Sequence, residues 1–216
     1  GGLFMLIFIK NGPYRQTSKT LDLSVCFKVF KNVNFRKAAF GYFGHMWELY
    51  TFWAFIPALL IKYQEAHIEI IFNVPLLSFT IIAIGSFSCV LGGYISQNFG
   101  TKNTAFSFLL LSCLCCLVSP FVFQLANENI FIGFLLFWGM VVIADSPLFS
   151  TLVAKNAPSE DKGTALTIVN CIGFTITIIS IQIVSSLVNL TNSNLIFSIL
   201  AIGPLFGLYN LRKKLN

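Results

Sequence analysis

The chain has 216 residues, of which 56% are hydrophobic and only 10% are charged, and its formal net charge is +6. Soluble domains carry about a quarter charged residues, so this composition excludes a water-soluble fold and indicates an integral membrane protein. The sequence contains no zinc-finger or RNA-binding motif, and we expect no nucleic-acid partner in spite of the positive charge.

The N-terminal run GGLFMLIFIK is apolar but short, and it lacks the basic n-region of a signal peptide. We interpret residues 1–9 as the end of a preceding transmembrane helix, and the chain as a fragment of a larger protein. Residues 10–37 form a basic linker. Its stretch LSVCFKVFKNVNF places apolar residues at helical spacing between lysines, which fits a short amphipathic helix on the membrane surface or a solvated linker.

Six apolar segments of the length that a bilayer core requires, roughly 20 residues, follow the linker. They span about 38–61, 74–96, 104–124, 130–153, 164–187 and 195–211, and residues 212–216 form a basic tail. The segments lack the period-two alternation of a β-barrel strand. The expected fold is therefore an all-α membrane domain of six transmembrane helices over residues 38–211, since helices satisfy their own backbone hydrogen bonds in lipid.

The basic residues indicate the orientation of these helices. Every Lys and Arg except Lys62 falls in one set of segments, namely the linker, the tail and the loops 97–103 and 154–163. Cytoplasmic loops of membrane proteins carry an excess of Lys and Arg. We therefore expect the linker and the C-terminus to face the cytoplasm.

The chain has six cysteines, and five of them lie inside apolar runs. The CLCC stretch at Cys113–Cys116 has no His, Asp or Glu close to it in sequence. Thiols in such surroundings act as small hydrophobic side chains. We predict no metal site, no disulfide and no cofactor.

Three ionisable side chains interrupt two of the six segments: His45 and Glu48 lie in 38–61, and Asp145 lies in 130–153. With a rise of 1.5 Å per residue, His45 lies roughly 10 Å, Asp145 roughly 12 Å and Glu48 roughly 15 Å from the cytoplasmic end of its helix. His45 and Glu48 are three residues apart, so they share a helix face. All three are thus expected at similar depths.

A charge in the bilayer core costs about 2.5–3.5 kcal/mol, so these side chains must face protein or a water-filled cavity, or be neutral. One interpretation is a proton-binding or substrate-binding constellation in a cavity; the other is a set of structural polar groups that lock helices together. Gly41 and Gly44, beside the same face, leave room for a substrate or for a neighbouring helix. Pro147, two residues after Asp145, predicts a broken backbone there.

The layout of a truncated helix, a basic linker, six helices and a basic tail resembles the C-terminal half of a major facilitator superfamily transporter, from the end of its sixth helix through its twelfth. The loop GGYISQNFGTK is similar to the family's loop motif between the second and third helices of a half. Gly93, Gly100 and Lys102 match it, whereas Gln97 stands where the motif has an acid. The resemblance implies that this loop takes part in the conformational switch, without the acidic partner.

A second stretch, APSEDKGTALTIVNCIGF, resembles the family's connection between the fourth and fifth helices of a half. Pro158, Glu160, Lys162 and Gly163 match its pattern. The resemblance implies two inverted three-helix repeats, about 38–124 and 130–211, and it places the first helix of each repeat beside the central cavity. These are the two segments that contain the ionisable residues.

The resemblance implies transport of a small solute by alternating access in a bacterial plasma (inner) membrane, not an enzymatic activity. Because the intramembrane residues titrate, we expect a proton-coupled secondary transporter. Its partners would be the solute, H⁺, the lipid bilayer and the missing N-terminal half. The alternative is a half-length or non-transporting protein, such as a channel, a receptor or a membrane enzyme, with structural intramembrane polar residues. No catalytic motif such as HExxH or a P-loop supports the enzyme.

Overall fold

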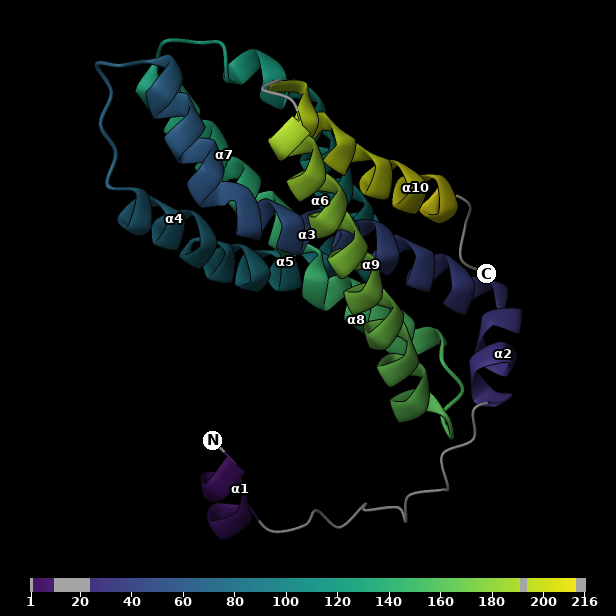
Figure 1. Ribbon diagram of the computed structural model, residues 1–216. Coiled ribbons are helices and arrows are strands. Elements are labelled where there is room, and N and C mark those ends of the chain that lie inside the picture. The colour runs from purple at the N-terminus through teal and green to yellow at the C-terminus, as the bar shows by residue number, and fades with distance from the viewer. Residues whose placement is uncertain (1, 10–23, 191–193, 213–216) are drawn as a thin grey trace.

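The computed structural model describes residues 2–9, 24–190 and 194–212. Secondary structure within these ranges is helical throughout (Figure 1). The tail beyond 212 and the linker residues 10–23 lie outside the described residues. The helix α1 (Gly2–Phe8) falls in the predicted N-terminal remnant, and α2 (Ser24–Lys31) falls in the linker.

Helices cover almost all of the six predicted segments. In chain order they are α3 (Val33–Ala66), α4 (Val74–Ala83), α5 (Gly85–Phe99), α6 (Thr101–Val122), α7 (Glu128–Ala144), α8 (Ser146–Asn156), α9 (Lys162–Leu190), the 3₁₀ helix η1 (Asn194–Ala201) and α10 (Ile202–Leu211). The second and fourth segments are each divided, so that α4 and α5 form one stretch and α7 and α8 another. The prediction of an all-α membrane fold is confirmed.

Among the described residues, four helical stretches are long and apolar enough to cross a membrane, namely Val74–Phe99, Thr101–Val122, Glu128–Asn156 and Lys162–Val188. The stretch Leu195–Leu211 is apolar but shorter. The longest helix, α3, is outside this set because His45, Glu48 and its many Tyr and Trp residues lower its hydropathy. About half of its side chains are buried against other helices. Its position in the interior explains how it tolerates polar residues.

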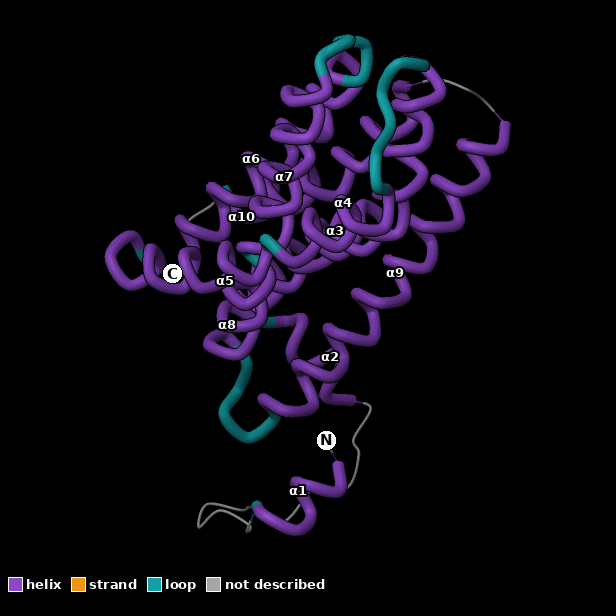
Figure 2. Tube along the Cα trace, turned by 90° about the vertical axis from the view of Figure 1, so that its left-hand side faces the viewer, coloured by secondary structure: helices purple, strands orange, loops and turns teal. Residues whose placement is uncertain are grey.

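The helices of each predicted repeat pack mainly on helices of the other repeat. The first helix of the first repeat, α3, packs on α9 and α10 of the second, and the first helix of the second, α7, packs on α5 and α6 of the first. The two third helices, α6 and η1–α10, pack on each other, and α3 also contacts α8. Figures 1 and 2 show the resulting bundle, with α9 along one side of α3. Two interlocked three-helix units would produce this pattern of contacts.

Glycines bring α3 and α10 into backbone contact. A Cβ on Gly44 would collide with the carbonyl oxygen of Gly203, and a Cβ on Gly203 would lie 2.5 Å from the carbonyl oxygen of Gly44. A Cβ on Gly207 would lie 3.3 Å from the carbonyl oxygen of Gly41. Small residues permit such close approach of helices in membranes. The sequence left open whether Gly41 and Gly44 make room for a substrate or for a neighbouring helix. In the structure, the neighbouring helix α10 occupies the space beside them.

The linker helix α2 is attached to the loop between α8 and α9. Nζ of Lys28 lies 3.2 Å from Oδ2 of Asp161 and 3.5 Å from Oε1 of Glu160. The hydrogen bond and the charge of Asp161, together with Glu160, raise the pKa of Lys28 above its ordinary value. Asn32 then caps α3, because its side-chain oxygen accepts from the N–H groups of Asn34 and Phe35. Residues 24–31 of this stretch are therefore helical.

Replacing Gly44 with alanine tests the α3–α10 contact. We expect Gly44→Ala to lower the stability of the purified protein by about 1–3 kcal/mol, because the methyl group has no space and the two backbones must separate. The matched control is Gly133→Ala on α7, where a Cβ has nothing within 4 Å. Thermal unfolding in detergent measures both variants. Equal melting temperatures would contradict the contact.

Candidate functional site

His45 and Asp145 form a buried pair between α3 and the junction of α7 with α8. Nδ1 of His45 lies 3.0 Å from Oδ1 of Asp145, and the side chains are 1% and 0% exposed. The two residues are 100 positions apart in sequence, so the pair joins the two repeats. It unites two of the three ionisable residues that the sequence singles out.

A break in the helix places Asp145 in this position. The helix α7 ends at Ala144 and α8 begins at Ser146, and Asp145 has φ −86° and ψ −13°. Pro147 has no N–H to give to the carbonyl of Ile143, four residues earlier. The Ile143 oxygen instead lies 3.5 Å from Sγ of Cys89 on α5, which donates to it. The broken backbone expected at Pro147 is therefore observed.

The pair has unused hydrogen-bonding capacity. In the described part of the chain, neither oxygen of Asp145 accepts a hydrogen bond, and Nε2 of His45 has no hydrogen-bond partner. The 3.0 Å approach thus brings a ring nitrogen and a carboxyl oxygen close together without the alignment of a hydrogen bond. The rings of Phe149 and Tyr42 flank His45, with centroids 5.8 and 6.1 Å from the imidazole. Buried polar atoms in such apolar surroundings are normally paired, so this pair calls for an explanation.

The carboxylate of Glu48 has a full set of donors. Oε1 accepts from Nε1 of Trp138 at 2.8 Å and from Sγ of Cys116 at 3.2 Å, and Oε2 accepts from the hydroxyl of Ser112 at 2.9 Å. Glu48 is 0% exposed. The donors come from α6 and α7, so Glu48 ties α3 to both helices.

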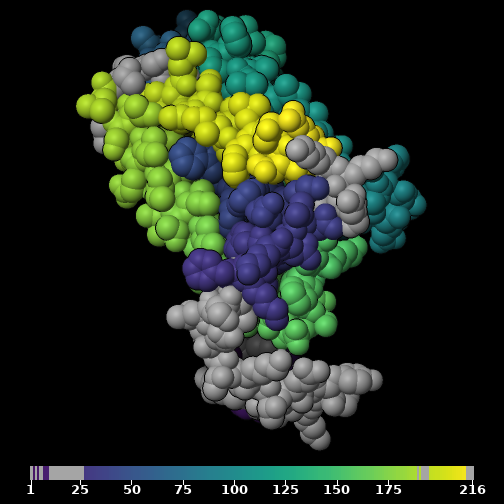
Figure 3. Space-filling model, turned by 90° about the vertical axis from the view of Figure 1, so that its right-hand side faces the viewer, coloured from purple at the N-terminus to yellow at the C-terminus, as the bar shows by residue number. Residues whose placement is uncertain are grey.

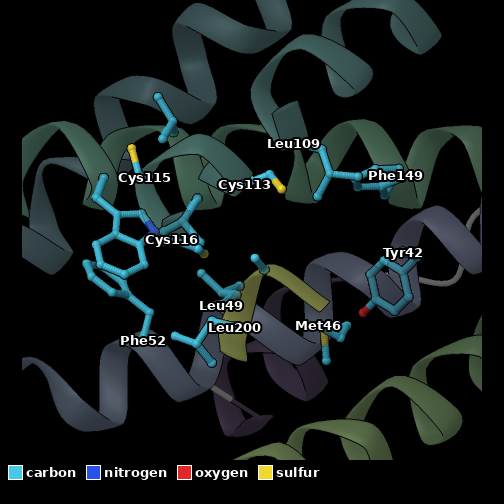
Figure 4. Close-up of a cluster of buried hydrophobic side chains, with 14 of the residues drawn as sticks. Tyr42, Met46, Leu49, Phe52, Leu109, Cys113, Cys115, Cys116, Phe149 and Leu200 are labelled. Carbon is cyan, nitrogen blue, oxygen red and sulfur yellow. The ribbon is translucent and has the colours of Figure 1, made fainter. Parts of the chain in front are cut away.

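The three donors Ser112, Cys116 and Trp138 form a cradle around Glu48, and this cradle lies in the apolar core. Figure 4 shows Cys116 within the cluster of buried side chains that includes Leu49 and Phe52 of α3. The ring of Trp138 also packs on Phe52, with centroids 4.5 Å apart. Sequence reasoning missed these partners of Glu48. The signal available was the spacing of Ser112 and Cys116, four residues apart on one face of α6.

The three predicted site residues therefore divide into two parts, a His45–Asp145 pair and a Glu48 cradle. Each part is closed from the surface of the described bundle. No three His, Cys, Asp or Glu side chains of the described residues converge as metal ligands would.

Hydrogen bonds also join α3 to α9. The hydroxyl of Tyr42 donates to Oδ1 of Asn170 at 3.0 Å, and the hydroxyl of Thr51 donates to that of Ser180 at 2.8 Å. Ser180 in turn donates to the carbonyl of Trp47 at 2.7 Å. These bonds run along the same helix that carries the ionisable residues, so a movement of α3 has to break or carry them.

The predicted switch loop is almost entirely helical, with Gly93 and Gln97 inside α5, Lys102 inside α6, and Gly100 as the one residue between the two helices. Gly100 ends α5 with φ +82°, a conformation that favours glycine, whereas Gln97 is exposed and Lys102 is half-buried. A Cβ on Gly93 would have nothing within 4 Å. The backbone conformation of the turn therefore favours glycine at position 100, whereas the space around Gly93 would accept a side chain.

A contact joins this loop to the end of α8. Nζ of Lys155 donates to the hydroxyl of Thr101, the first residue of α6, at 3.3 Å. The contact connects the α5–α6 turn of the first repeat with the α7–α8 unit of the second. It lies at the end of α8 away from Asp145.

The fold and these contacts define a multi-pass helical membrane protein with three ionisable side chains, His45, Glu48 and Asp145, buried inside the bundle. The family model of the Major Facilitator Superfamily matches residues 2–182. The chain therefore belongs to the major facilitator superfamily of membrane transporters, which confirms the resemblance in layout. Comparison with curated proteins found no match.

Replacing Trp138 with phenylalanine tests the cradle. We expect Trp138→Phe to destabilise the protein by about 1–3 kcal/mol, because the buried Glu48 carboxylate loses its closest donor. The control is Trp53→Phe, since Nε1 of Trp53 has no hydrogen-bond partner among the described residues. Chemical unfolding in detergent compares the two. An equal loss of stability in both variants would show that the indole N–H of Trp138 contributes nothing.

Proposed function

We propose that the protein is a proton-coupled secondary transporter of a small solute, and that the His45–Asp145 pair binds and releases the coupled proton. The observation that carries this proposal is the buried pair itself, with unpartnered polar atoms on both side chains. A titratable pair inside a transporter's membrane domain is a functional site by default, because its burial is costly.

The chemistry of the pair suggests how a proton changes the packing. With His45 protonated and Asp145 ionised, opposite charges 3.0 Å apart attract strongly in a low-dielectric interior. A further proton on Asp145 removes this attraction, and loss of the proton from His45 removes it as well. The contact between α3 and the α7–α8 junction therefore depends on how many protons the pair holds.

The helix break offers a place for the movement. The ladder of backbone hydrogen bonds is interrupted where Asp145 joins α7 to α8, so this junction is where α8 would rotate relative to α7. We propose that the described arrangement is the closed state, and that opening exposes the pair to one side of the membrane. Glu48, held by three donors, would keep α3 against α6 and α7 during this change.

The proposal extends to the position of the solute, the orientation of the chain and the region where α5 meets α6. The solute would bind between this bundle and an N-terminal half, beside α3 and α7, in the alternating-access cycle of the superfamily. The distribution of Lys and Arg supports a cytoplasmic position for the linker and C-terminus in a bacterial plasma membrane. The end of α5 with Gly93 and Gln97, the turn at Gly100 and the start of α6 with Lys102 would change contacts between the two states.

Transport in proteoliposomes tests the coupling. The complete transporter that carries this chain is given a panel of radiolabelled solutes under an imposed pH gradient. We expect Asp145→Asn and His45→Gln to abolish accumulation driven by the gradient, while exchange of solute without a gradient persists. The loss of uphill transport should exceed about tenfold, because the pair supplies the coupling site.

Asp161→Asn is the matched control. Asp161 carries the same carboxylate but pairs with Lys28 outside the bundle, so its variant should retain gradient-driven accumulation. If the Asp145→Asn protein remains fully dependent on the pH gradient, the pair is a structural lock between the repeats and the proposed coupling fails.

A further inference from the structure

A small pocket with two basic side chains lies where α3 begins and α10 ends. It has a volume of about 180 Å³ and is lined by Val33, Arg36, Lys37, Phe40, Tyr209 and Asn210. These six residues include two positive charges and no acid. The guanidinium of Arg212 adds a third positive charge nearby, 4.1 Å from the centre of the Tyr209 ring.

An apolar pocket of about 350 Å³ adjoins the basic one, and Phe40 lines both. Its walls come from three helices and include Trp47 of α3, Ile176 of α9 and Phe206 of α10. Gly44 and Gly203 also line it, at the backbone contact between α3 and α10. Figure 3 shows this face, with α10 in yellow beside the purple start of α3 and the yellow-green α9.

The basic pocket and the apolar pocket together form one groove, and the length of this groove matches one leaflet of a bilayer. Lys37 and Trp47 are ten residues apart on α3, so the groove extends roughly 15 Å along the helix axis. The hydrocarbon core of a bilayer is about 30 Å thick, so half of it is the same length. The groove has a basic end and an apolar wall as long as one leaflet is deep. It therefore complements a phospholipid, which has a charged headgroup and apolar acyl chains.

We infer that this groove binds a single anionic phospholipid, with its phosphate group on Arg36 and Lys37 and an acyl chain between α3, α9 and α10. Arg36 donates to the carbonyl of Phe30 at 3.3 Å, and its guanidinium has five N–H donors in all, so it can also contact a phosphate. A net-negative headgroup fits two basic side chains better than a zwitterionic one. The apolar wall selects a lipid over free phosphate.

The position of this lipid gives it a way to influence the bundle. It would touch Trp47, whose Nε1 donates to the carbonyl of Ile199 at 3.3 Å and whose backbone oxygen accepts from Ser180. The lipid would thus contact α3 on the side away from the proton-binding pair. This site follows from the membrane fold alone and stands whether or not the protein couples transport to protons.

Fluorescence quenching by brominated lipids tests the inference. Within these 216 residues, Trp53→Phe leaves two tryptophans, Trp47 in the groove and the buried Trp138. The protein is reconstituted in vesicles of phosphatidylcholine that contain either dibromo-phosphatidylglycerol or dibromo-phosphatidylcholine at equal content. We expect the brominated anionic lipid to quench Trp47 at a lower content, and a further Trp47→Phe change to remove this difference.

Charge variants locate the headgroup. We expect Arg36→Gln and Lys37→Gln each to weaken the preference for the anionic lipid about fivefold, as one surface charge is worth. The control is Lys155→Gln with Lys162→Gln, which removes two charges from the end of α8 and the start of α9. Circular dichroism checks that every variant is folded. Free phosphate should not compete.

Three results would overturn the inference. Equal quenching by both brominated lipids would show an ordinary lipid-facing surface. An equal loss of preference in the Lys155 and Lys162 control would show a general effect of charge. A preference that appears only after truncation of residues 213–216 would show that the chain's own tail fills the groove.

Discussion

The burial of three ionisable side chains is the constraint on which the arrangement of this bundle depends. Charges exposed to lipid are costly, and α3 carries two of the three. The helix therefore lies inside the bundle, where α6 and α7 supply donors for Glu48 and the α7–α8 junction supplies Asp145 for His45. The polar contacts fix which face of α3 meets which neighbour, and the apolar residues between them fill the core.

The two parts of the site are built differently, and the difference suggests different roles. Glu48 is satisfied by three donors from two helices, which describes a fixed joint. His45 and Asp145 have unpartnered atoms and meet at an interrupted helix, which describes a contact that can change. In addition, the glycine contact of Gly44 with Gly203 holds the backbones of α3 and α10 together. One helix thus combines fixed contacts with a titratable one.

Much of this organisation follows from sequence, because apolar length, loop charges and isolated ionisable residues are local signals. The membrane class, the helical fold, the family and the break near Pro147 are all of this kind. The partners of Glu48 are not, since Ser112, Cys116 and Trp138 are 64 to 90 residues away and look apolar or neutral in their own helices. Sequence also left open whether Gly44 faces a solute or a helix, because a missing side chain does not identify its neighbour.

The central claim is that the His45–Asp145 pair changes its proton content while Glu48 stays in its cradle. Infrared difference spectroscopy of the purified protein, recorded between mildly acidic and alkaline pH, measures this through the C=O stretch of protonated carboxylic acids. The account predicts a band that appears on acidification, disappears in Asp145→Asn and persists in Glu48→Gln. A band that survives in Asp145→Asn, or that is lost only in Glu48→Gln, would contradict it.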